Sequence, residues 1–85
     1  METRVAVVGI VVEDSESVEK LNAILHEYGS YIIGRMGVPY RTRGISVISI
    51  ALDAPNDVIS SMAGQIGNLS GVSAKTAYSS VSFVD

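Results

Sequence analysis

The sequence predicts a two-layer α+β domain, in which a four-stranded antiparallel sheet carries two helices on one face. Three observations predict this fold. Residues 3–12 and 45–52 are strongly apolar and rich in β-branched residues, as buried strands are. Each is followed by acidic residues and a helix-type spacing of apolar residues, and then by glycine and another strand-like stretch. The order is therefore β-α-β-β-α-β, within a chain of 85 residues that has the length of one domain.

The first half begins with a strand at residues 3–12, in which Gly9 predicts a bulge or a close backbone approach. Asp14 or Ser15 is placed to cap the helix that follows. Gly29 is expected to end this helix in the left-handed conformation. Apolar residues recur along the helix at spacings of three and four and define one apolar face, formed by Val18, Leu21, Ile24, Leu25 and Tyr28.

The centre of the chain is predicted to be a hairpin. Residues 30–36 form its first strand. Residues 37–44 contain the glycines and the proline of a reversing loop, and their number favours a long loop over a two-residue turn. Residues 45–52 form the second fully apolar strand.

The second helix is predicted to start around residues 53–57, where Pro55 suits the first turn. Gly64 and Gly67 weaken this helix and predict that it packs closely. Its apolar face is formed by Val58, Ile59, Met62 and Ile66.

The last strand is predicted at residues 72–78, where apolar and polar residues alternate. The apolar residues of 79–85 are expected to extend that strand or to cover a partner subunit. We therefore predict a single domain at residues 1–79 and a C-terminal tail at 80–85.

The simplest arrangement of these elements is a ferredoxin-like sandwich, with strand order 4-1-3-2 and both helices on one side. The two most apolar strands then lie in the centre of the sheet. The uncovered face of such a sandwich should be polar. Here both faces of the central strands are apolar, which is unusual for a monomer. We therefore expect the open face to pack against another copy of the chain, in a homo-dimer or homo-tetramer.

Composition excludes several classes of function. The chain has no cysteine, which excludes a disulfide, a thiolate nucleophile and a Cys-type metal site. His26 is the only histidine, and it is interpreted as either a partly exposed helix residue or a ligand contact. Since one histidine cannot supply the three or four ligands of a transition-metal site, we predict no metal and no cofactor. No set of residues for nucleophilic or acid–base catalysis is apparent, so we expect no enzyme activity.

Charge is unevenly distributed along the chain. The net charge of −3 argues against general nucleic-acid binding. Residues 28–44 nevertheless hold Arg35, Arg41 and Arg43 and no acid. Together with Tyr40 and the backbone N–H groups of nearby glycines, these arginines are suited to a phosphate or a carboxylate. The alternative is a solvent-exposed hairpin or a salt-bridged contact between subunits.

Three acidic residues follow the central strands: Glu13 and Asp14 after the first, and Asp53 after the second. As paired carboxylates they are suited to a hard cation or an amine. Helix capping and compensation of the helix dipole explain the same positions without a ligand. The two groups also lie at opposite ends of an antiparallel sheet, which weakens the paired interpretation.

The N-terminus shows no signal-peptide pattern, and the apolar runs are too short to span a bilayer. We therefore expect a cytoplasmic protein without membrane contact.

Two segments carry a resemblance to a known family. One is Tyr-Gly-Ser-Tyr-Ile-Ile-Gly-Arg-Met-Gly-Val-Pro-Tyr at 28–40, and the other joins Gly-Ile-Ser-Val-Ile-Ser at 44–49 to Leu-Asp-Ala-Pro-Asn-Asp-Val-Ile at 52–59. With them, residues 2–79 resemble the small proteins named as regulators of the iron-only hydrogenase system. The resemblance implies an ACT-like form of the ferredoxin-like fold, similar to the metal-sensing domain of nickel-responsive repressors. It also implies an association with the maturation of iron-only hydrogenases.

The chain is expected to differ from the nickel repressors in two respects. It lacks their N-terminal ribbon-helix-helix segment for DNA. Residues 52–58 contain no histidine or cysteine where nickel ligands would be expected. Direct DNA binding and nickel sensing are therefore not expected.

We expect an oligomeric ACT-like domain with a regulatory or effector-binding role. ACT-like domains generally place ligands at subunit interfaces near strand–helix loops. The resemblance therefore implies a ligand site at such an interface, and we expect the ligand to be small and anionic. The predicted ligand-binding residues are Glu13, Asp14, Arg35, Tyr40, Arg41 and Arg43. The alternative is a ligand-free protein–protein adaptor or assembly factor for metallo-enzyme maturation, with a protein partner and no effector.

Overall fold

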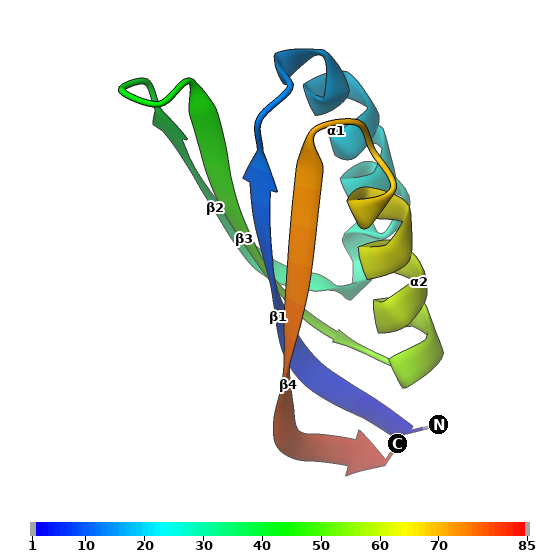
Figure 1. The fold of residues 1–85 in the computed structure, drawn as a ribbon. Helices are drawn as coiled ribbons and strands as arrows, with labels where there is room; N and C mark the ends of the chain where they lie inside the picture. The colour runs from blue at the N-terminus through cyan, green and yellow to red at the C-terminus, as the bar shows by residue number, and fades with distance from the viewer. Residues whose placement is uncertain (1, 85) are drawn as a thin grey trace.

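A computed structural model describes residues 2–84. Strands β1 (Glu2–Val12), β2 (Ile32–Tyr40), β3 (Ile45–Ala54) and β4 (Val72–Val84) form one antiparallel sheet in the order β2-β3-β1-β4. Helices α1 (Val18–Glu27) and α2 (Asn56–Gly67) cover one face of the sheet (Figure 1). Two 3-10 turns, η1 (Ser15–Ser17) and η2 (Gly29–Tyr31), precede and follow α1. The predicted ferredoxin-like α+β fold and its strand order are confirmed.

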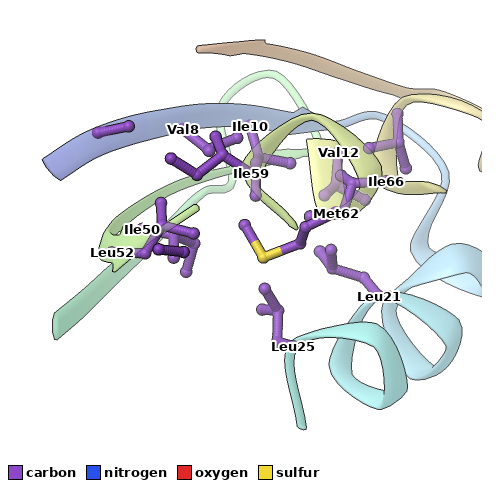
Figure 2. Close-up of a cluster of buried hydrophobic side chains, with 13 residues drawn as sticks. Val8, Ile10, Val12, Leu21, Leu25, Ile50, Leu52, Ile59, Met62 and Ile66 are labelled. Carbon is purple, nitrogen blue, oxygen red and sulfur yellow. The ribbon is translucent and has the colours of Figure 1, made fainter. Parts of the chain in front are cut away.

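The core lies between the sheet and the helices, because alternate residues of a strand point to the same side. In β1 the even-numbered residues from Ala6 to Val12 are buried, and Val8 pairs with Ile50 of β3. Figure 2 shows the buried side chains of the strands and of both helices gathered around Met62. The helices contribute Leu21 and Leu25 from α1 and Ile59, Met62 and Ile66 from α2. Burying each large aliphatic side chain stabilises the fold by about 1.5–3 kcal/mol.

The other side of the sheet, which we call the open face, carries neither helix (Figure 1). It is formed by the odd-numbered residues of β1 and β3 and by alternate residues of β2, as the strand register requires. The prediction that both faces of the central strands are apolar is confirmed. On β1, β2 and β3, the exposed large apolar side chains of the open face include Met36 at 64%, Val38 at 50%, Tyr40 at 48%, Val47 at 44% and Val7 at 41%.

The hairpin loop between β2 and β3 is shorter than predicted. β2 continues to Tyr40, so only residues 41–44 form the loop, with Gly44 at a φ of +67°. The prediction of a loop at 37–44 was wrong because it relied on Gly37 and Pro39, residue types that are common in turns but that lie in β2 here. An edge strand tolerates proline because only one of its sides forms ladder hydrogen bonds, and Pro39 lies in β2 opposite Ser46.

Two predictions made for glycine in the first half were wrong. Gly9 lies in regular pairing between β3 and β4, and the register shifts occur elsewhere, within β2 after Ile32 and beside Arg4 in the pairing of β1 with β4. Gly29 does not adopt a left-handed conformation; among residues 2–84 only Gly44 and Gly71 have a positive φ. α1 instead tightens into η2, so its end needs no left-handed residue.

The close packing predicted for α2 at its glycines was also wrong. Apart from the nearby backbone of α2 itself, a Cβ atom added at Gly64 or Gly67 would meet no atom of residues 2–84 within 4 Å. Both glycines therefore lie on the outer side of a helix that packs through Ile59, Met62 and Ile66.

The predicted tail is part of the sheet as far as the structure describes it. β4 continues to Val84, and its last residues pair with the start of β1, Ser82 opposite Arg4 and Val84 opposite Glu2. Residue 85 lies outside the described residues. The boundary between a domain at 1–79 and a tail at 80–85 stays a prediction.

Candidate functional site

The six predicted ligand-binding residues lie in three separate places. Glu13 and Asp14 follow β1, at the end of the sheet where Val12 pairs with Ser46. The hairpin of β2 and β3 lies at this same end and holds the second group, Tyr40, Arg41 and Arg43. Arg35 lies further along β2, opposite Ile50, on the helix-covered side. Asp53 pairs with Val5 at the far end of the sheet, so the predicted separation of the carboxylates is confirmed.

Asp14 has a structural role at the start of η1. Its Oδ1 accepts a hydrogen bond from the N–H of Glu16 at 2.9 Å, which caps the 3-10 turn. A Cβ added at Gly71 would lie 2.6 Å from the Cβ of Asp14, so the α2–β4 turn packs directly on this residue. These contacts favour capping over ligand binding at Asp14.

The β1–α1 loop is fastened to the same turn by two hydrogen bonds. The N–H of Glu13 donates to the carbonyl of Gly71 at 2.7 Å, and the buried hydroxyl of Ser17 donates to the carbonyl of Ser70 at 2.6 Å. The side chain of Glu13 remains exposed. The loop is therefore a fixed support, and only Glu13 of the predicted pair faces solvent freely.

The hairpin presents its arginines at the rim of the open face. Tyr40 pairs with Ile45 on that face, and the exposed residues Arg41 and Arg43 follow it. The loop is closed by backbone hydrogen bonds from Arg43 to Tyr40 and from Gly44 to Arg41, each of 3.2 Å. Gly34 and Gly37 lie within β2, so the structure does not bring their N–H groups together with Gly44 as predicted for an anion nest.

Arg35 lines a cavity between α1 and β2 of about 390 Å³. Its Nη2 donates to Oδ1 of Asn22 at 3.4 Å. The other lining residues include His26, interpreted from sequence as either an exposed helix residue or a ligand contact, and Gly29. Leu25 and Ile32 complete the lining. Sequence reasoning missed Asn22, although its four-residue spacing from His26 on one helix places the two side by side.

A second cavity of about 350 Å³ lies at the start of α2, where it meets the first residues of β1. The guanidinium of Arg4 lines it and also lies 5.9 Å from the ring centroid of Tyr78. Its lining includes the acids Glu2 and Asp57. Three buried polar atoms at this end of the sheet have no hydrogen-bond partner among residues 2–84: Thr3 Oγ1, Arg4 Nε and Asp53 Oδ1.

No three histidine, aspartate or glutamate side chains within residues 2–84 are grouped closely enough to hold a metal ion. In the same part of the chain, neither helix has the length and hydrophobicity needed to cross a membrane.

The fold and the open apolar face define an ACT-like, ferredoxin-like domain. A family model described as "TM1266-like", that of an iron-only hydrogenase system regulator, matches residues 4–76. The chain belongs to this family, which confirms the resemblance seen in the sequence.

The chain is similar to several solved structures. The uncharacterized protein TM1266 from Thermotoga maritima is 31% identical, with a TM-score of 0.86 over 89% of this chain and 96% of that one. A formyltetrahydrofolate deformylase from Pseudomonas putida KT2440 is 13% identical, with a TM-score of 0.62 over 86% of this chain and 28% of that one, which shows the fold alone. None of the curated proteins matches the chain.

Proposed function

We propose that the protein is a cytoplasmic regulator within an iron-only hydrogenase system, and that it works as a homo-oligomer assembled through the open face. It would bind a small anionic ligand at the rim of that interface and pass the signal to a protein partner in hydrogenase maturation. The observation that supports this proposal is the apolar open face, in a family described as regulators.

The size of the open face fits an interface. Its apolar side chains lie on three neighbouring strands, β2, β3 and β1. Three strands spaced about 4.8 Å apart, over about eight residues of 3.3 Å each, cover roughly 380 Å² in projection. The largest apolar patch on a typical monomer has about this size and is often functional. A second copy offers the same patch, so a two-fold dimer pairs apolar surface with apolar surface.

The ligand part of the proposal rests on the hairpin. Tyr40 lies on the open face, and Arg41 and Arg43 extend past its edge without an acidic residue between them. In a face-to-face assembly these guanidinium groups would border the interface, where their planar donors suit a carboxylate or a phosphate.

Size-exclusion chromatography with light scattering, at micromolar concentration, gives the mass of the wild type and of Val47→Asp and so tests the assembly. Val47 lies on β3 between Val11 of β1 and Val38 of β2, so the new carboxylate would stand in the middle of the patch. We expect an oligomeric wild type and a folded, monomeric variant. Val18→Asp is the matched control, since Val18 is also a partly exposed valine but lies in α1, on the other side of the sheet. A monomeric wild type would refute the proposal.

The ligand-free adaptor remains a second candidate, because neither of the two cavities described above is lined by Tyr40, Arg41 or Arg43. A melting-temperature screen with phosphate, carboxylates and nucleotides separates the two functions, since a ligand of the native state raises the melting point. Stabilisation that is lost in the double variant Arg41→Gln, Arg43→Gln supports the effector site. An oligomer that no anion stabilises supports the adaptor.

A further inference from the structure

The cavity between α1 and β2 lies on the helix-covered side of the sheet, away from the open face and the hairpin loop. We infer that this cavity is a binding site for a small organic acid. The carboxylate would pair with Arg35, and the apolar body would rest on Ile32. The inference does not depend on assembly through the open face, because its residues lie on the other side of the sheet.

The position of Arg35 follows from its place in an edge strand. It lies opposite Ile50, whose side chain is buried beneath the helices, so Arg35 points to the same side. β2 is the outermost strand next to β3, which leaves the guanidinium beside α1 rather than under it. The long contact of 3.4 Å to Asn22 uses one of the five N–H donors of the guanidinium. The other donors are free to form the paired hydrogen bonds that a carboxylate accepts.

The charge of the lining favours an anion. Asp and Glu together number nine in the chain and outnumber Lys and Arg, yet none of them lines this cavity. Arg35 supplies a permanent positive charge, and the imidazole of His26 adds a ring N–H in the last turn of α1. The cavity at the start of α2 differs, since Glu2 and Asp57 line it beside Arg4.

The apolar part of the lining favours an organic acid over a bare inorganic anion. Ile32 is half-buried and offers apolar surface to the lining, whereas Leu25 is almost completely buried and adds little to it. Gly29 leaves the space open, because a Cβ at this position would meet no atom within 4 Å. The space of about 390 Å³ is open to solvent on one side and is large enough for a small acid.

The test uses the full chain labelled with ¹⁵N, titrated with butyrate and with benzoate and followed by amide chemical shifts. The neutral amides butyramide and benzamide are the ligand controls, and inorganic phosphate tests whether the apolar body matters. We expect both carboxylates to shift amides within residues 22–35 in a saturable manner, and the neutral amides to shift them much less. Shifts confined to the hairpin loop, or equal shifts with the neutral amides, would overturn the inference.

Two variants assign the binding to this cavity. Arg35→Gln should weaken carboxylate binding about fivefold, which is what one exposed charge-assisted contact is worth. Gly29→Leu keeps Arg35 but fills the open space, and it should weaken benzoate more than butyrate. Lys20→Gln, which removes a positive charge from an exposed position of α1 outside the lining, should leave both affinities unchanged. An unaltered benzoate affinity in Gly29→Leu would show that the anion binds a surface arginine only, and the inference would fail.

The monomeric variant Val47→Asp separates this inference from the proposed function. It should still bind both carboxylates with the affinity of the wild type. Binding that is lost together with the oligomer would show that the cavity is not the site.

Discussion

The two faces of the sheet are built from the same strands and the same residue types, but they differ in what covers them. Val8 is fully buried beneath the helices, whereas its neighbour Val7 is 41% exposed on the open face. Ile50 and Val47 repeat this difference in β3. A sheet face that meets only solvent is expected to carry polar residues. β1 and β3 therefore carry two surfaces suited to burial, and the helices cover only one of them.

The largest expected effect is a difference in the free energy of unfolding between variants of the helix-covered face and variants of the open face. Ile50→Ala removes three carbons from the closed core, so unfolding should become easier by about 3–4 kcal/mol, including the cavity left behind. Val47→Ala should cost at most about 0.5 kcal/mol in the dilute protein, since its side chain is already half exposed. Urea unfolding at submicromolar concentration measures both.

If Ile50→Ala does not fold, Ile50→Val replaces it, with an expected loss of about 1 kcal/mol. Equal losses at Ile50 and Val47 in dilute solution would contradict the difference between the faces.

A second effect on stability compares the α2–β4 turn with the β2–β3 loop, through one glycine of equal φ in each. Gly71 and Gly44 both have a φ of +67°, but only at Gly71 would a Cβ collide with Asp14. Alanine in the left-handed region costs about 1 kcal/mol by itself. We therefore expect Gly44→Ala to lower stability by about 1 kcal/mol, and Gly71→Ala by about 3 kcal/mol because the β1–α1 loop must also move. Thermal unfolding followed by circular dichroism distinguishes them, and similar melting points would refute the packing of that loop.

The alternation of residues made the faces predictable, whereas the position of α1 did not follow from the sequence. Valine or isoleucine at six of the eight positions of 5–12, with Ala6 and Gly9 at the other two, predicts two apolar faces, and the cap at Asp14 follows from local chemistry alone. The end of β2 was mispredicted because glycine and proline are common in turns, although the predicted strand order already placed β2 at an edge, where Pro39 is tolerated. The partners of Arg35 depend on how far α1 extends over that edge, so grouping it with the hairpin arginines was the natural error.

A third prediction compares the two faces of the sheet at low and at high protein concentration. If a second copy covers the open face, Val7 is exposed only in the monomer. Val7→Ala should then lower the melting point by a small amount in dilute solution and by more at high concentration, because loss of interface burial weakens the oligomer. The loss should reach roughly 1 kcal/mol per subunit, the value of burying about one methyl group. Val8→Ala is the control and should lower stability equally at both concentrations.

The smallest effect is expected at Arg35, at the margin between the two layers. Its contact with Asn22 is long and both side chains are exposed, so Arg35→Gln should change the free energy of unfolding by less than about 0.5 kcal/mol. Arg41→Gln removes the same charge from the hairpin and should behave alike. Urea unfolding of the two variants beside wild type decides the matter. A loss above about 1 kcal/mol at Arg35 alone would mean that the arginine fastens β2 to α1, and a fastened guanidinium would not be free to bind an acid.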